Sequence, residues 1–174
     1  MHRTARSYIV AVCFAAMATI VHADERKDIF LQRASVPVSD LDAALAFYVD
    51  TLGLTAGPVG ESASETFRAM FYVGEGVASR FALLDAHDGQ PRVIGLVEVD
   101  GLAVDAASNR VNAPALVFGV TDMNGIYARS RAAGYEVLVA PAPLLGFDGK
   151  AIGTEMALFD PDGNRVILFE LNGP

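Results

Sequence analysis

Two helical patterns of apolar residues occur along the chain, and each follows an apolar strand-like run and a similar short signal. The first pattern begins at Val38-Ser39-Asp40-Leu41 and the second at Val120-Thr121-Asp122-Met123. In both, apolar residues then recur three and four positions apart, which is the spacing of one helix face. The sequence therefore predicts an internal repeat with one helix in each copy.

Capping residues predict where the two helices begin and end. Ser39 with Asp42 resembles a capping box at the start of the first helix, and Thr121 takes the same place in the second. Gly53 and Gly134 are suited to the helix ends, because glycine readily adopts the left-handed conformation found there. These limits predict two helices of nearly equal length.

Short strand-like runs follow each predicted helix and are separated by turns rich in glycine and aspartate. They cover Phe67–Val73, Arg80–Leu84 and Arg92–Val99 in the first copy, and Glu136–Ala140, Glu155–Phe159 and Arg165–Leu171 in the second. The pattern of each copy thus predicts one strand, one helix and three further strands. Together the two copies predict an α+β fold of two βαβββ modules. We place the modules at about residues 28–100 and 114–172, with a linker at about 101–113. The segment Pro141–Gly153 is predicted to be an irregular, mobile rim.

The first residues predict export. Arg3 and Arg6 precede the apolar stretch Tyr8–Val21, and a small residue, Ala23, precedes a charged run. Basic, apolar and small residues in this order are typical of a signal peptide, and the apolar stretch is shorter than the roughly 20 residues that a membrane-spanning helix requires. We predict a leader at residues 1–23 and a periplasmic or secreted mature domain at 24–174.

Charge and composition narrow the classes of partner. The formal charge is −8, and removal of the leader makes it −10 because the leader contains two arginines and no acidic residue. Nucleic acid and anionic membranes are therefore unsuitable partners. Charge does not decide the assembly, which is left open between a monomer and a homodimer. The single cysteine, Cys13, lies in the leader, so no disulfide is expected to support the fold.

The signal beginning at Val38, continued by Leu52-Gly53-Leu54, resembles the opening of a vicinal-oxygen-chelate module, the unit of the glyoxalase and bleomycin-resistance proteins. The turn Asp160-Pro161-Asp162-Gly163-Asn164 and the apolar strand after it resemble the closing hairpin of the second module. The resemblance implies two modules whose curled mixed sheets enclose a cleft. Glyoxalase-like and drug-binding functions are the activities that it implies.

The resemblance also implies four positions for metal ligands, two on first strands and two on last strands. Here they hold Arg33, Gly95, Ala115 and Ile167, none of which ligates a metal in the usual way. His87 is the only histidine after residue 23, and its turn with Asp85 and Asp88 reads as solvated rather than metal-binding. We therefore predict no metal and no other cofactor.

Alternation along the strands predicts which side chains face the cleft. From the four former ligand positions, this face is expected to hold the ligand-binding residues Arg33, Ser35, Gly95, Val97, Ala115, Val117, Ile167 and Phe169. Arg33 either binds an anionic group or reaches solvent or a local acid such as Asp28. Glu98 and Glu170 fall on the opposite face, where structural contacts are favoured, unless a bulge turns Glu170 inward as an acid or base. Tyr48 and Tyr72 are predicted to be core residues.

Three functions remain open, and no catalytic residue is assigned. The favoured function is metal-free binding of a small apolar molecule. In one version of this hypothesis the molecule also carries an anionic group. The second is a metal-independent or atypical glyoxalase-like lyase or isomerase, which would need a carboxylate or tyrosine in the cleft. The third is a protein-interaction module whose cleft is not used for a ligand.

Overall fold

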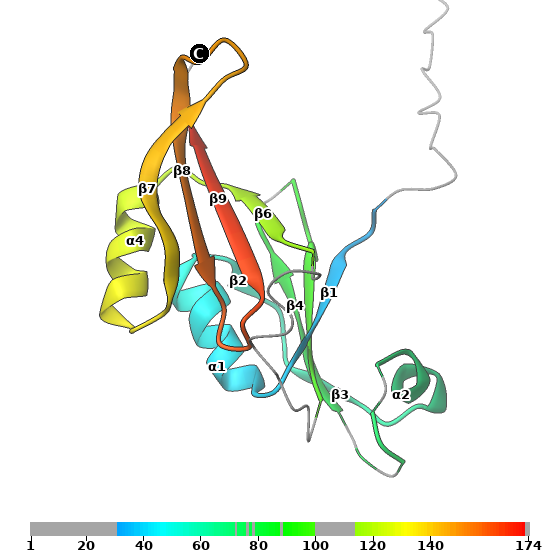
Figure 1. Cartoon of the computed structure of the whole chain (residues 1–174). Coiled ribbons are helices and arrows are strands. Elements are labelled where there is room, and N and C mark those ends of the chain that lie inside the picture. The colour runs from blue at the N-terminus through cyan, green and yellow to red at the C-terminus, as the bar shows by residue number, and fades with distance from the viewer. Residues whose placement is uncertain are drawn as a thin grey trace, which may run out of the picture. The chain divides into compact units, whose positions relative to one another are not determined.

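The strands form two mixed sheets that repeat one order (Figure 1). The first sheet has the order β1 (Ala34–Val38), β5 (Ile94–Glu98), β4 (Ser79–Asp85) and β2 (Thr55–Ala56), and β3 (Gly60–Ser62) also pairs with β4. The second has the order β6 (Leu116–Gly119), β9 (Arg165–Leu171), β8 (Ala151–Phe159) and β7 (Val137–Leu145). Strand β1 runs parallel to β5, and β6 runs parallel to β9 in the same way. The predicted α+β fold and its internal repeat are confirmed.

This computed structural model describes residues 31–71, 73–75, 77, 79–87, 89–99 and 114–172. The predicted leader and linker lie outside the described residues, as do Asp28, Tyr72 and Asp88. The helices of the described part are α1 (Leu41–Leu45), which continues as the π-helical segment η1 (Ala46–Thr51), α2 (Glu65–Phe71) and α4 (Met123–Ala132). None of these described helices has the length and apolar character needed to cross a membrane.

Both helix ends were predicted correctly, but both starts are shifted by one residue. Gly53 and Gly134 have φ of 89° and 79°, so each ends its helix in the left-handed region. The N-cap of α1 is Asp40, whose carboxylate accepts from the backbone N–H groups of Asp42 and Ala43, and not Ser39. Asp122, not Thr121, caps α4 by accepting from the N–H of Gly125. A carboxylate also complements the positive end of the helix dipole, which a hydroxyl does not.

Two predicted elements are wrong. Phe67–Val73 is not a strand, because α2 covers most of it: Phe67 and Phe71 lie four residues apart on one helix face, and the Ser64 hydroxyl accepts from the Phe67 N–H. Pro141–Gly153 is not irregular throughout, since β7 runs to Leu145 and β8 begins at Ala151. The prolines in β7 are tolerated because β7 is an edge strand and its outer N–H groups have no ladder to complete.

One hydrophobic core is shared by the two sheets. Alternate residues of β1, β4 and β5 and of β6, β8 and β9 pack with the apolar faces of α1, η1 and α4 in a single cluster. Its most deeply buried large side chains include Phe47, Tyr48, Leu84, Leu158 and Leu168. One face of each sheet is used for this core. On the opposite face of the first sheet lies a second, smaller cluster, formed by Val73, Val97 and Val99 with Phe67, Phe71, Val77 and Phe81.

We expect Gly153→Ala to lower the free energy of unfolding by about 1 to 3 kcal/mol, the usual effect of an overpacked site. A Cβ atom at position 153 would lie 2.3 Å from the carbonyl oxygen of Glu170 in the neighbouring strand. Gly119→Ala is the matched control, because a Cβ there would meet nothing within 4 Å. Denaturant unfolding of both variants tests this, and equal stabilities would contradict it.

Candidate functional site

The face of the first sheet that is turned away from the shared core carries a cleft of about 300 Å³, which we call the sheet-face cleft. Its floor follows the strand register, with Ser35 opposite Gly95 and Gly95 opposite Leu83, and Val97 opposite Phe81. Four predicted ligand-binding residues come together here. The lining residues are Arg33, Ser35, Phe67, Met70, Phe71, Phe81, Leu83, Gly95, Leu96 and Val97.

The side chain of Arg33 lies beside Gly95 at the floor of this cleft. A Cβ atom at position 95 would lie 3.4 Å from the Arg33 Cδ and 3.7 Å from the Ser35 hydroxyl. Leu83 Cδ2 lies 3.4 Å from the same point, so the Arg33 stem and Leu83 together cover the buried Gly95. Among the described residues, Arg33 forms no ion pair with a carboxylate. Within the described part of the chain, its hydrogen-bond donors thus have no anionic partner in a cleft that is otherwise mostly apolar.

Helix α2 forms a wall of the sheet-face cleft that sequence reasoning missed. Phe67 packs against Phe71 and Phe81, with ring centroids 4.8 and 5.9 Å apart respectively. Phe81 is in turn placed by Gly60, its cross-strand neighbour, because the Phe81 ring occupies the space that a Cβ at position 60 would need. The spacing of Phe67, Met70 and Phe71, three and four residues apart, is the local signal for this helix face.

The other four predicted ligand-binding residues belong to the second sheet and do not line the sheet-face cleft. Val117 pairs with Ile167, and Phe169 lies next along the same face, while Ala115 precedes β6. Glu155 pairs with Phe169 and so shares this face with it. Sequence reasoning missed Glu155 because its face depends on the register between β8 and β9.

The two glutamates predicted to lie away from the cleft do so. Glu98 accepts a hydrogen bond from the Leu41 N–H at 2.9 Å and lies 3.4 Å from an Arg80 nitrogen. Arg80 also holds Asp42 at 2.8 Å, and this hydrogen bond lowers the pKa of Asp42. Strand β9 pairs with β8 without a register shift, so no bulge turns Glu170 toward the other face.

The residues at the four positions implied for metal ligands do not fit a metal ion. Gly95, Ala115 and Ile167 have no ligating side chain, and Arg33 offers only N–H donors. In the described part of the chain, no group of three or more His, Cys, Asp and Glu side chains could hold a metal. His87 instead accepts the Gly89 N–H through Nδ1, and Asp85 accepts the Arg92 N–H.

A buried carboxylate network connects the two modules near the start of α1. The Tyr48 hydroxyl donates to Asp160 at 2.9 Å, and the Ser39 N–H donates to Asp162 at 3.0 Å. Asp160 is 4% exposed and also accepts from the backbone N–H groups of Asp162 and Asn164 and from the Asn164 side chain. Burial raises the pKa of Asp160 despite these hydrogen bonds, and burial beside this carboxylate raises the pKa of Tyr48. Tyr48 is a core residue, as predicted.

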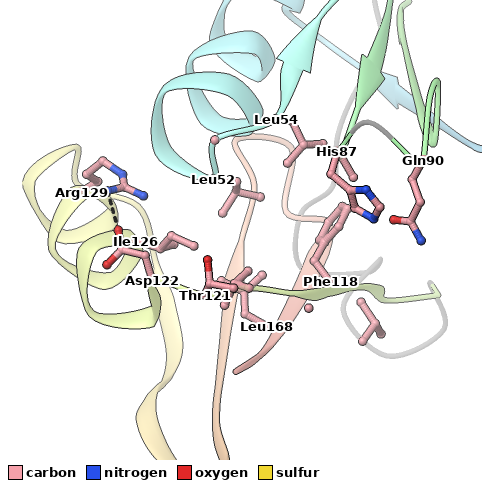
Figure 2. Close-up of a pocket in the computed structure, with 15 residues that line it drawn as sticks. Leu52, Leu54, His87, Gln90, Phe118, Thr121, Asp122, Ile126, Arg129 and Leu168 are labelled. Atoms are coloured by element: carbon pink, nitrogen blue, oxygen red, sulfur yellow. Dashed lines mark hydrogen bonds and ion pairs between the residues drawn. The ribbon is translucent and has the colours of Figure 1, made fainter. Parts of the chain in front are cut away.

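A second cleft, of about 450 Å³, lies between the edge of β6, the end of the first helix and the turn after β4 (Figure 2). We call it the junction cleft. Figure 2 shows His87 and Gln90 on one side, Leu52 and Leu54 above, and the paired Arg129 and Asp122 at the other end. Its lining residues are Leu52, Gly53, Leu54, Ala86, His87, Gln90, Val117, Phe118, Gly119, Val120, Thr121, Asp122, Ile126, Arg129 and Leu168.

The chain belongs to the glyoxalase/bleomycin resistance protein/dioxygenase superfamily, whose family model matches residues 30–168. Its fold is similar to a glyoxalase family protein from Bacillus cereus, with a TM-score of 0.66, 20% identity, and coverage of 86% of this chain and 99% of that one. A second similar structure is the trypanothione-dependent glyoxalase I of Leishmania major, with a TM-score of 0.54, 16% identity and coverage of 82% and 86%.

A third is the fosfomycin resistance protein of Listeria monocytogenes, solved with Mn(II) and a dihydroxypropylphosphonic acid, with a TM-score of 0.52, 16% identity and coverage of 84% and 95%. At these identities the similarities show the fold alone. No curated protein matches the chain.

Proposed function

We propose that the chain is an exported binding protein that takes a small apolar molecule with a negative group into the sheet-face cleft. The observation that carries the proposal is Arg33, a guanidinium without an ion-pair partner among the described residues, whose side-chain stem lies against Gly95 on the cleft floor. Phe67, Phe81 and Leu83 supply the apolar walls. A volume of about 300 Å³ is at the lower end of the range for small-molecule sites.

The negative charge of the chain means that binding of an anionic ligand depends on a local cationic group such as Arg33. With a formal charge of −8, the protein as a whole repels anions, so an anionic ligand needs a specific cationic contact. Hydrogen bonds to a charged group contribute about 1.5 to 3 kcal/mol each, and a guanidinium can supply two in parallel. Apolar burial of the rest of the ligand then adds roughly 25 cal/mol per Å².

Binding is favoured over acid/base catalysis by the chemistry of the lining residues. Arg33 and Ser35 are the polar side chains among the described residues of the sheet-face cleft, and no carboxylate, histidine or tyrosine accompanies them. Neither group is a good proton acceptor at neutral pH. The cleft can therefore bind and orient a ligand, whereas a lyase or isomerase would need a base from elsewhere.

Native mass spectrometry of the protein isolated from the cells that make it tests both parts of the proposal. We expect a bound acidic organic molecule at one per chain, and a denatured mass that corresponds to residues 24–174. A stoichiometric divalent metal that stabilises the protein, in place of an organic ligand, would contradict the binding proposal. Retention of residues 1–23 in a membrane fraction would contradict the proposal of export.

A further inference from the structure

The junction cleft has the size and lining of a second small-molecule site. Its volume of about 450 Å³ lies inside the range of ligand pockets. Leu52, Leu54, Phe118, Ile126 and Leu168 supply the apolar part of its lining, and polar groups supply a similar share. Leu52, Leu54 and Ile126 are buried in the shared core. Because these side chains are fixed by core packing, the cleft is largely formed before anything binds.

One wall of the junction cleft is the edge of β6 that faces away from β9, and β9 is its only partner among the described strands. The Val120 N–H bonds to the Phe169 carbonyl of β9. Backbone groups of a parallel strand alternate between its two sides, so those of Val117 and Gly119 point away from β9. Both residues line the cleft. They offer a backbone donor and a backbone acceptor to a ligand beside the strand.

The opposite wall presents polar side chains from a tight turn. The Ala86 N–H bonds to the Gln90 carbonyl and the Gln90 N–H bonds to the His87 carbonyl, which fixes the turn. His87 Nδ1 accepts the Gly89 N–H, so its Nε2 is the ring donor left for other contacts. The Gln90 side chain supplies both an amide donor and an amide acceptor.

The charged groups at the far end of the junction cleft balance each other. Arg129 Nη1 lies 3.2 Å from Asp122, and Arg129 Nε donates to the Thr51 carbonyl. The guanidinium is thus paired, whereas that of Arg33 has no carboxylate partner among the residues that the structure describes, and the Arg129–Asp122 pair adds no net charge. An ionic ligand would have to compete with this pair, whereas an uncharged one would not.

From this arrangement we infer that the junction cleft binds an uncharged molecule with an apolar body and a hydrogen-bonding group, at a site separate from the sheet-face cleft. The apolar side chains of the lining contact its body. The edge of β6 that faces away from β9 and the turn bearing His87 and Gln90 bind its polar group. Because its walls come from both modules, the occupied site joins the two halves of the domain.

Two probes with the same aromatic body separate the two sites. N-phenylnaphthylamine is uncharged, and anilinonaphthalene sulfonate adds one negative group. In fluorescence titrations we expect N-phenylnaphthylamine to bind saturably, and Thr121→Phe to weaken it by about tenfold or more because a ring then occupies the cleft. Thr121 is exposed, and its side chain points into the cleft (Figure 2). The sulfonate probe should bind Thr121→Phe as it binds the unmodified protein.

Gln90→Trp, in the exposed turn on the opposite wall, is the second blocking variant if Thr121→Phe does not fold, and the melting temperature of each variant is measured first. Arg33→Ala should leave the affinity for N-phenylnaphthylamine unchanged. Absence of saturable binding, or equal affinity in folded blocking variants, would overturn the inference. So would a loss of this probe in Arg33→Ala alone, which would place it in the sheet-face cleft. Failure of the sulfonate probe to bind would count against the proposed function and not against this site.

Discussion

Arg33→Ala is expected to weaken binding of anilinonaphthalene sulfonate in the sheet-face cleft by about ten- to a hundredfold. The magnitude follows from hydrogen bonds to a charged group, which contribute roughly 1.5 to 3 kcal/mol. The loss should appear mainly as weaker binding rather than as unfolding, because Arg33 precedes β1 and is not part of the hydrophobic core. Calorimetric titration with thermal melts of the same samples measures both effects.

Two further variants distinguish the charge of Arg33 from its shape. Arg33→Lys should recover part of the affinity, because lysine keeps the charge but does not present a planar pair of donors. Ser35→Ala, on the same face, should have a smaller effect because it removes an uncharged group. If Arg33→Ala binds the sulfonate as tightly as the unmodified protein, the cleft selects its ligand by shape and apolar contact alone.

Asp160→Ala is expected to lower the free energy of unfolding by about 3 kcal/mol or more. It would leave the Tyr48 hydroxyl and the Asp162 and Asn164 N–H groups without their acceptor, and each unsatisfied buried group costs about 1 to 3 kcal/mol. Exposed Asp148→Ala is a suitable control, since its ion pair with Lys150 is a surface contact. Similar stabilities of the two variants in denaturant unfolding would contradict a structural role for the buried network.

The raised pKa of Asp160 also predicts how this contribution depends on pH. Burial raises the folded-state pKa above the unfolded value near 3.9, so the contribution to stability is greatest below the unfolded pKa and declines as pH rises through the folded pKa. Asp160→Asn does not titrate at this position. The stability advantage of the unmodified protein over Asp160→Asn should therefore grow as pH falls from about 7 to 4. A constant difference, or one that shrinks, would be the contrary result.

The repeat was predictable from the sequence because its signals are local. Val38-Ser39-Asp40-Leu41 and its second copy mark helix starts to within one residue, and Gly53 and Gly134 mark the ends because a positive φ favours glycine. Both ends of strand β9, Arg165–Leu171, were predicted correctly, because a turn precedes the strand and most of its residues are apolar. In each case the deciding interaction lies within a few residues of the signal.

The parts that were not predicted depend on contacts between distant residues. Phe67 and Phe71 suit a strand or a helix equally until Phe81, on another strand, supplies the surface against which α2 packs. The strand extension through Pro141 and Pro143 requires that β7 be at the edge, which is a property of the sheet order. The predicted ligand-binding residues fall into two groups on different sheets for the same reason. Alternation along a strand predicts the face on which a side chain lies, but not which sheet faces enclose one cleft.

The most direct test of the account is a backbone amide NMR titration with anilinonaphthalene sulfonate. We expect saturable shifts for Ser35, Leu83, Gly95 and Val97 around the sheet-face cleft, with little change at Gly119 and Thr121 in the junction cleft. In Arg33→Ala the same amides should shift at higher probe concentration. Saturable shifts confined to the second sheet or to the junction cleft, with none at Ser35 and Gly95, would contradict the account.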